Sequence, residues 1–478
     1  MDVVLFALAI AVAGWGGLGV TLLLADRAPE QASDQQPVGA VAVLCLSFLF
    51  GTALVSLSSF VIGVATGVTT RPVATVVCVA VGAAGVWVQR VAVAGWLRRL
   101  PRVRPSPIGA GVLIVSLLMT VTTWRFARRI MLGWDGLHIW EFKARLAFDH
   151  GGTVPAAYFR DTTRMWSHVD YPQFLPLTET WVYGWLRRPD QEALVVLFPL
   201  FLLVACGLLW VGVRLLGTSR TVAPALAVVA LLAIPFVTFG EGSASSGYAD
   251  VPLATWFLAA VVFGIHHIRS GSAQSLRFAV AAAAVLPWVK REGTVLLGCF
   301  VVLLCLALVA RRAVGVSRWS ATWRSVVTVG GPGFAVFLMW RAYLAHVDVA
   351  PHAEYLPITF DRLRDNFDRT SVIANAVWEE ATRWEQWSLL WPMVLLAAVV
   401  WAVRHRGVER VLLPGLVLVP IAVSCSVYYF SGWNPVIRHI EASLPRLMLQ
   451  VAPVAVLLLA LAVPARAPAM LEPQSPVD

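Results

Sequence analysis

The chain has 478 residues, of which 59% are hydrophobic and 13% are charged. A soluble globular domain carries about twice this charged fraction, so the composition excludes a soluble protein and indicates a polytopic membrane protein. The formal net charge of +10 is explained by arginines on short cytoplasmic loops, without a nucleic-acid partner. All six cysteines fall inside apolar runs, which supports neither a disulfide framework nor a thiolate metal site.

Apolar runs long enough to cross a bilayer recur along the whole chain, at about 20 residues for each crossing. The first run lacks the basic start and the cleavage site of a signal peptide, so we expect a retained helix. The run at 275–290 is short enough to be re-entrant. An all-α protein with about 13 spans is predicted, at 3–25, 39–66, 72–97, 108–130, 191–214, 221–240, 251–268, 275–290, 294–310, 325–345, 388–403, 410–430 and 447–463.

The orientation follows from the short connections, because arginine-rich short loops stay on the cytoplasmic side. Arginine-rich connections alternate regularly at 98–107, 214–220, 269–277, 311–324 and 404–410. The amino terminus is then outside and the tail at 464–478 inside. Most carboxylates lie on the outer side, in long loops at about 131–190 and 346–387 and a shorter segment at 431–446.

The first external loop begins directly after a span, with Trp134 and Asp135. The segment from Asp135 to about Phe148 is predicted as an amphipathic helix on the membrane surface, with Lys143 and Arg145 in water. Its apolar face would comprise Trp134, Ile139, Trp140, Phe142 and Leu146. One interpretation is an interfacial belt helix. The other is that Asp135 is a general base whose proton affinity rises in the reduced dielectric at the lipid boundary.

Only two of the 37 basic residues are lysine, Lys143 and Lys290, and both fall in polar motifs of the predicted outer face. Codon usage in a high-GC bacterium, such as an actinobacterium, is one explanation. The functional explanation is that a compact ammonium beside carboxylates and aromatic rings suits an anionic, sugar-bearing ligand.

A second motif of the same loop holds His168, Asp170 and Tyr171, followed by Pro172 and Pro176. The prolines predict an extended, rigid chain. His168 and Asp170 could bind a hydroxyl-rich ligand, or the motif could be an ordinary loop. A divalent metal held by these two residues and His138 is a further alternative, but the spacing is not diagnostic. No cofactor is therefore predicted.

The next external turn runs from Gly240 to Asp250 and contains small residues that let a ligand approach the backbone. Tyr248 and Asp250 are its candidate binding residues. Asp250 precedes Pro252 at the start of a predicted span, where a carboxylate interacts favourably with the helix dipole. Helix capping is therefore the structural alternative for Asp250.

Lys290, Arg291 and Glu292 lie between two predicted spans, where charges near membrane depth cost about 2.5–3.5 kcal/mol each. Lys290 and Glu292 could neutralise each other, or Lys290 and Arg291 could form a phosphate cradle. Arg438 and Arg446 are eight residues apart, so we expect them on one face of a helix, joining that cradle or forming a solvated face.

Five short motifs resemble those of bacterial GT-C glycosyltransferases, namely Trp-Asp-x4-Trp-x2-Lys-Ala, Asp-Tyr-Pro, Gly-Tyr-Ala-Asp-x-Pro-Leu-Ala, Lys-x-Glu-Gly and Ser-Leu-x-Arg. The nearest groups are relatives of the protein O-mannosyltransferases and of the lipid A aminoarabinose transferase. The resemblance covers roughly 108–460. It implies membrane helices at 1–107, a GT-C-like catalytic domain at 108–463 and a short tail.

The resemblance implies an inverting transfer from a polyprenyl-phosphate sugar, with Asp135 as the catalytic base and Lys143 nearby. Lys290, Arg291, Arg438 and Arg446 would hold the phosphate. The chain departs from the family in having Gly136 where many O-mannosyltransferases have a second acid, and three additional early spans. It also has no soluble domain near the carboxy terminus.

The sequence therefore predicts a glycosyltransferase of the bacterial plasma membrane, acting on the extracytoplasmic face on a glycan, lipid or protein hydroxyl. The alternatives are an envelope polysaccharide polymerase or ligase, and a transporter that flips a lipid or polysaccharide. A transporter is expected to carry ionisable residues near the bilayer midplane and often shows repeats, whereas the polar motifs here share one face and no repeat is seen. Beside Asp135, the expected binding residues are Trp134, His138, Lys143, His168, Asp170, Tyr171, Tyr248, Asp250, Lys290, Arg291, Glu292, Arg438 and Arg446.

Overall fold

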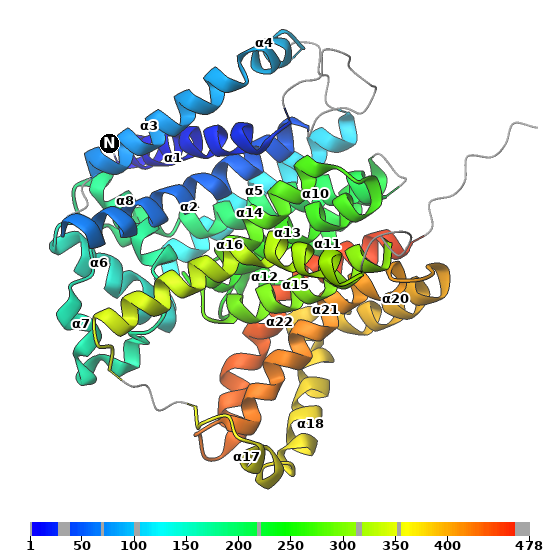
Figure 1. Ribbon diagram of the computed structural model, residues 1–478. Helices are drawn as coiled ribbons and strands as arrows, with labels where there is room; N and C mark the ends of the chain where they lie inside the picture. Colours follow the sequence, from blue (N-terminus) through cyan, green and yellow to red (C-terminus); the bar gives the residue numbers. More distant parts are fainter. Residues whose placement is uncertain are drawn as a thin grey trace, which may run out of the picture.

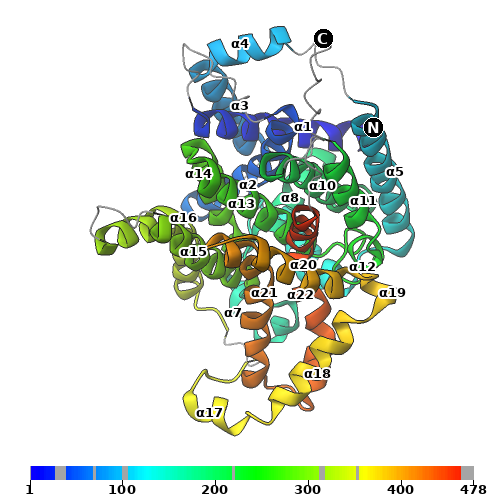
Figure 2. The ribbon, with the colours of Figure 1, turned by 90° about the vertical axis from the view of Figure 1, so that its right-hand side faces the viewer.

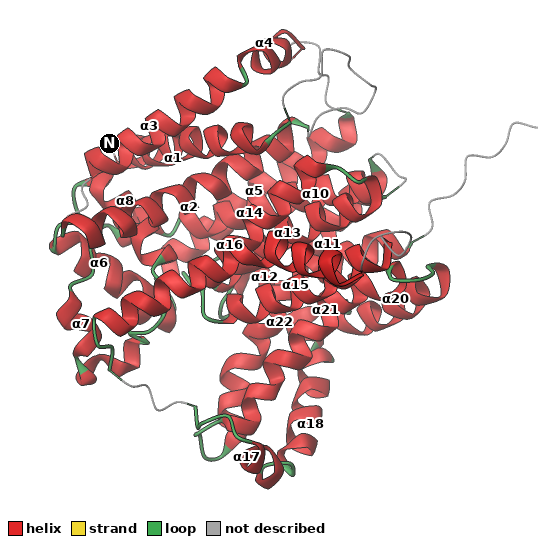
Figure 3. Ribbon diagram, in the orientation of Figure 1, coloured by secondary structure: helices red, strands yellow, loops and turns green. Residues whose placement is uncertain are grey.

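The computed structural model describes residues 2–26, 39–67, 71–99, 106–217, 221–311, 318–350 and 355–463 (Figure 1). Helices dominate this part of the chain, and its one β pairing is an isolated bridge between Tyr355 and Ser431 (Figure 3). Ten of the helices are long and apolar enough to cross a membrane. The protein is thus an all-α polytopic membrane protein, as predicted. The predicted tail at 464–478 lies outside the described residues.

The long helices correspond to ten of the predicted spans, and the other three predicted spans hold the shorter apolar helices α11 (Val222–Leu232), α14 (Ala273–Val289) and α20 (Leu390–Arg404). The count of 13 crossings stays a prediction. The long helices are α1 (Asp2–Leu24), α2 (Ala40–Thr66), α3 (Arg71–Val88), α5 (Pro107–Ile130), α10 (Leu197–Leu216) with α9 (Gln191–Leu194) before it, α13 (Asp250–Ser270), α15 (Glu292–Arg311), α16 (Arg318–His346), α21 (Glu409–Cys425) and α22 (Val436–Ala462). A short helix, α4 (Arg90–Arg99), follows α3.

The last helix is longer than predicted, because α22 begins at Val436 and not near 447. The prediction placed the start of this span at the first residues of the apolar run. The helix begins earlier, because a helix can extend beyond the apolar layer into polar sequence. Most of the predicted outer segment 431–446 is therefore the first part of α22. This extension carries Arg446 on the same rigid element as the buried residues that follow it.

The predicted first external loop is folded into five short helices and is not an open loop. They are the π-helix η2 (Gly136–Glu141), α6 (Phe142–Asp149), α7 (Ala156–Arg160), the 3-10 helix η3 (Thr162–Ser167) and α8 (Phe174–Leu186). The predicted helix to Phe148 is present, but the prediction that Lys143 lies in water is wrong. Trp140 and Lys143 have no exposed surface, because the turn at His168 and helix α8 cover them.

The expected extended chain after His168 is also wrong. His168 ends η3 in the left-handed region, with φ of 49°, and α8 begins six residues later at Phe174. Pro176 lies in the first turn of α8, where a backbone N–H has no helical acceptor, so proline is tolerated there.

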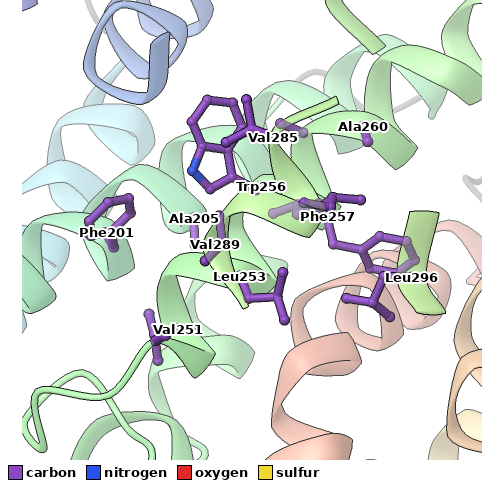
Figure 4. Packing of buried hydrophobic residues seen from close by; sticks show 14 of the residues in the cluster. Phe201, Ala205, Val251, Leu253, Trp256, Phe257, Ala260, Val285, Val289 and Leu296 are labelled. Atoms are coloured by element: carbon purple, nitrogen blue, oxygen red, sulfur yellow. The ribbon is translucent and has the colours of Figure 1, made fainter. Parts of the chain in front are cut away.

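The apolar core is centred on α13, of which 89% of an 18-residue window is buried. Figure 4 shows its side chains packed against those of three neighbouring helices; the labelled residues are Val251, Leu253, Trp256, Phe257 and Ala260 of α13, Phe201 and Ala205 of α10, Val285 and Val289 of α14, and Leu296 of α15. Because α13 is fixed on every side, its first residue, Asp250, has a well-defined position.

The amino-terminal helices pack directly on the rest of the molecule. The indole of Trp181 in α8 donates to the carbonyl of Ala9 in α1 at 3.1 Å. The indole of Trp288 in α14 donates to Ser56 Oγ in α2, also at 3.1 Å. Residues 1–107 and 108–463 therefore share buried contacts.

The predicted second external loop forms part of a helical projection, together with the end of α21 and the start of α22 (Figures 1 and 2). It consists of α17 (Phe360–Asp365), α18 (Arg369–Ala381) and α19 (Trp384–Trp387). Arg369 donates to the carbonyl oxygens of Tyr428 at 2.9 Å and Ser431 at 3.1 Å, in the segment that joins α21 to α22. The loop is thus attached to the extended start of α22.

Candidate functional site

Four stretches of the chain bring charged residues to the same end of the helix bundle. Asp135 follows α5, Asp250 opens α13, Lys290 and Arg291 form the connection from α14 to α15, and Arg446 lies within α22. We use the name charged cluster for these residues with Lys143, Asp170 and Glu292.

The centre of the charged cluster is an ion pair between the Asp135 carboxylate and the Arg446 guanidinium, each of whose side chains is less than a fifth exposed. The chain before Asp135 is held by a hydrogen bond from the Gly133 N–H to the Ser246 carbonyl, at 2.8 Å. At Gly136 a Cβ atom would lie 2.6 Å from that same carbonyl oxygen. The fold therefore has no room for the second acid that many O-mannosyltransferases carry after the first.

Asp250 and Lys290 form a second ion pair that is almost fully buried. Lys290 Nζ lies 2.8 Å from Asp250 Oδ1 and 3.0 Å from Glu292 Oε1, with side-chain exposures of 2% for Lys290 and 0% for Asp250. Asp250 Oδ1 also accepts a hydrogen bond from Gln450 Nε2 at 2.7 Å. Asp250 is thus engaged with side chains of other helices, and helix capping is not its main interaction. Lys290 and Glu292 do neutralise each other, as one alternative expected, but Asp250 shares the ammonium.

The two ion pairs come together beside the Cα atom of Gly242. A Cβ atom at Gly242 would lie 3.1 Å from Arg446 Cγ and 3.4 Å from Asp250 Oδ2. The Arg446 guanidinium also lies over the Tyr248 ring, 5.5 Å from its centre, and the Tyr248 hydroxyl donates to Glu241 Oε1 at 3.0 Å. The turn from Gly240 to Asp250 therefore joins the parts of the charged cluster.

Several polar atoms of the charged cluster are buried without a hydrogen-bond partner among the described residues. They are Asp250 Oδ2, Glu292 Oε2, Asp170 Oδ1 and Arg446 Nε. Buried polar groups in folded proteins are nearly always satisfied, so these atoms are available to a polar ligand or to water.

Arg291 extends the charged cluster towards the first external loop. Its guanidinium lies 3.3 Å from Asp170 Oδ2 and over the rings of Tyr355, at 4.7 Å, and Tyr171, at 5.4 Å. The Trp340 indole donates to the Asp170 carbonyl at 2.9 Å and fixes this turn from the side of α16.

Lys143 is the most buried base of the loop. Its ammonium donates to the His168 carbonyl at 2.7 Å and lies 5.7 Å from the centres of the Trp140 and Tyr171 rings. Burial lowers the pKa of Lys143 to about 7, although the nearby carboxylates of Asp170 and Asp135 act in the opposite direction. Lys143 thus belongs to the charged cluster and titrates near neutral pH.

The structure leaves four of the expected residues at the margin of this arrangement. Trp134 is 52% exposed and stacks on His138, whose Nδ1 lies 3.0 Å from the Trp134 carbonyl oxygen. Arg438 is exposed at the start of α22, and in the described chain no ion pair joins it to the charged cluster. His168 contributes its carbonyl to Lys143 and packs its ring on Tyr171, at 4.6 Å between ring centres.

Three residues of the site were not predicted. Gln450 lies one turn after Arg446, and its signal was a lone amide in an apolar run. His439, next to Arg438, is buried beside Tyr355 and hydrogen-bonded to Ser431 Oγ at 2.8 Å. Glu241 was visible only as a carboxylate among small residues. Among the residues described, no three His, Cys, Asp or Glu side chains are grouped to hold a metal ion.

A cavity of about 330 Å³ borders Arg446 on the side of α19. Phe236 and Phe239 of the short helix α12 (Pro235–Phe239) form part of its wall. Its charged groups are of both signs, with carboxylates from Glu241, Glu385 and Glu441 and a second guanidinium from Arg383. Arg446 therefore separates the charged cluster from a polar, partly aromatic cavity.

Comparisons with known proteins identified no relative of this chain. No family model matches the chain, no curated protein is detectably similar in sequence, and no solved structure matches the fold.

Proposed function

We propose that the protein is an integral membrane glycosyltransferase that transfers a sugar from a polyprenyl-phosphate donor to an acceptor hydroxyl with inversion. Its site would open to the extracytoplasmic face of a bacterial plasma membrane. The observation that carries the proposal is the contact of Asp135 with Arg446, next to the buried pair of Asp250 and Lys290. A carboxylate base beside cations at the end of membrane helices suits a lipid-linked donor.

In the proposed reaction, Asp135 accepts the proton of the acceptor hydroxyl. The oxygen then attacks the anomeric carbon of the sugar, and the bond from that carbon to the phosphate oxygen breaks. The electron pair of this bond leaves with the polyprenyl phosphate. Cations fixed near the leaving phosphate oxygen, above all Arg446 and Lys290, stabilise the charge that develops there.

The balance of positive and negative groups in the charged cluster determines which interaction a phosphate would have to replace. Lys143, Lys290, Arg291 and Arg446 are matched by four carboxylates, so the cluster has no surplus positive charge. An incoming phosphate must therefore replace a carboxylate on one of the cations. Arg446 is the best candidate, because a guanidinium binds phosphate with two parallel hydrogen bonds and its departure from Asp135 would free the base.

The cavity beside Arg446 is the candidate place for the acceptor. Its three carboxylates can accept hydrogen bonds from hydroxyl or amino groups, and its phenyl rings can pack on a sugar ring or a lipid. The arrangement thus favours an acceptor rich in hydroxyl groups.

The test is to incubate the purified protein with a panel of radiolabelled polyprenyl-phosphate sugars and to measure donor consumption. We expect the wild type to consume one donor of the panel. Independent preparations of Asp135→Asn should not consume that donor. If no donor of the panel is consumed while bound lipid is moved between the leaflets of reconstituted vesicles, the transporter interpretation replaces this one.

A further inference from the structure

A second cavity, of about 290 Å³, lies between α2, the start of α3 and α8. Its lining includes Ser59 of α2, the first turn of α3, the Gly151–Gly152 turn and residues of α8. Figure 1 shows α2 and α8 next to each other, with α6 beyond them. None of the residues of the charged cluster lines this cavity.

The charged groups of this cavity are all positive. Arg71 and Arg187 line it, and no carboxylate does. Among the described residues, no ion pair joins either arginine to an acidic side chain, in contrast to the adjacent Arg188, which is paired with Asp2 at 2.8 Å and Asp190 at 2.7 Å. Two guanidinium groups at one opening attract an anion, and their planar donors match phosphate.

Local structure holds both arginines in place. The Arg71 guanidinium lies over the Trp185 ring, 5.3 Å from its centre, and a Cβ atom at position 184 would lie 3.3 Å from Arg71 Cβ, so Gly184 leaves room for the arginine stem. Arg187 ends α8 in the left-handed region, with φ of 60°, where helices usually carry glycine. A side chain kept in this conformation at a helix end indicates a role beyond ending the helix.

Helix α8 also carries a buried acid that does not line the cavity. Glu179 of α8 is fully buried, and both of its carboxylate oxygens lack a hydrogen-bond partner among the described residues. Burial, assisted by the nearby Glu141, raises the pKa of Glu179 well above its usual range, which disfavours its charged form.

The other residues that line the cavity are mainly apolar, which indicates that the ligand also has an apolar part. Phe148, Leu177 and Trp181 provide an apolar wall, and α2 and α3 are both candidate membrane spans whose ends meet here. The first turn of α3, at Arg71 and Pro72, also presents the positive end of the helix dipole. A cationic rim over an apolar wall, at the end of membrane helices, fits a phosphate that is attached to a hydrocarbon chain.

We infer that this cavity is a binding site for the phosphate headgroup of an anionic membrane lipid. The site is separate from the charged cluster, and the inference does not depend on the proposed transferase activity.

The experiment measures lipid binding to the purified full chain in a neutral detergent, by titration with phosphatidylglycerol, phosphatidylcholine or inorganic phosphate. The test variant is Arg71→Gln with Arg187→Gln, and the matched control is Arg164→Gln with Arg188→Gln, which removes two arginines that are paired with carboxylates on the surface. We expect phosphatidylglycerol to bind about tenfold more weakly to the test variant, and equally to the control and the wild type. Phosphatidylcholine binding should be the same in all three.

A second variant separates loss of binding from loss of folding. Arg187→Gly removes one guanidinium and places glycine at a left-handed position that it adopts without strain, so the protein should unfold at the same temperature or higher. It should nevertheless lose part of its affinity for phosphatidylglycerol. Unchanged affinity in both arginine variants, or an equal loss in the control, overturns the inference. Arginine-dependent binding of inorganic phosphate without binding of phosphatidylglycerol also overturns it, in favour of a soluble anion.

Discussion

Helix α13 takes part in two regions of opposite character. Its first residue, Asp250, belongs to the charged cluster, whereas the residues from Leu253 to Phe263 form the centre of the apolar core (Figure 4). In the core, each side chain contributes burial and contact area, and the loss of one leaves a cavity. In the charged cluster, each group depends on a specific partner, and the loss of one leaves an uncompensated buried charge.

The two regions therefore differ in what a single substitution does. The core can tolerate an apolar exchange with a moderate loss of stability and no change in chemistry. The charged cluster loses both its electrostatic balance and the groups that would bind a donor. The predictions below use this difference.

Asp135→Asn is expected to have the largest effect on activity. An amide cannot accept the proton of the acceptor hydroxyl, so donor consumption should fall by about 10²–10⁴-fold. The affinity for the donor should be retained or increased, because Arg446 is released from its ion pair. Donor turnover and donor binding are measured on the same preparation. The control is Asp161→Asn, at a carboxylate on the surface of η3, which should leave both unchanged.

Lys290→Ala is expected to have the largest effect on stability. It leaves Asp250 and Glu292 buried without their shared ammonium, which should lower the free energy of unfolding by about 3–5 kcal/mol. The matched control, Arg128→Ala, breaks an ion pair with Glu192 whose side chains are 45% and 70% exposed, and should cost about 1 kcal/mol or less. Unfolding is measured in mixed micelles with increasing denaturant. Equal losses in the two variants would contradict the distinction between buried and exposed pairs.

Leu253→Ala tests the core side of the comparison. Leu253 is fully buried in α13, one turn from Asp250, so its truncation should lower the free energy of unfolding by about 2–4 kcal/mol. Donor affinity should stay within about twofold of the wild type, because no partner of a charged group is removed. A loss of donor affinity much greater than about twofold would show that the core and the charged cluster are not separable.

The sequence predicted the helices better than it predicted how their faces meet. Apolar runs mark spans because a membrane helix must bury its backbone polar groups, and each predicted span contains a helix. The motifs of Asp135, Asp250, Lys290 and Arg446 were found because their charges stand beside apolar runs on the predicted outer side, away from the arginine-rich connections. Their convergence could be expected only from the predicted topology, which puts them on one side.

Two predictions were wrong for reasons that lie outside the local sequence. One depends on how side chains are rotated around the axis of α22, and the other on a distant segment that covers Lys143. Residues eight apart on a helix are rotated by about 80°, whereas those four apart are rotated by about 40°. This is why Arg446 reaches the charged cluster with Gln450 while Arg438 stays exposed and His439 is buried. Lys143 was expected in water because its local pattern is amphipathic, and the turn that covers it lies 25 residues further along the chain.

The pH dependence of donor binding is the smallest expected effect, and it is specific to Lys143. Burial lowers the pKa of this ammonium to about 7, so its positive charge is present below that pH and is lost as the pH rises through it. Donor affinity in the wild type should therefore decrease by about two- to threefold between pH 6 and pH 8. Lys143→Arg keeps its charge over this range and should abolish the decrease, whereas Lys143→Met should bind at pH 6 as weakly as the wild type binds at pH 8. If Lys143→Met keeps the wild-type dependence, another group titrates, and Lys143 supports the fold of the loop without acting on the donor.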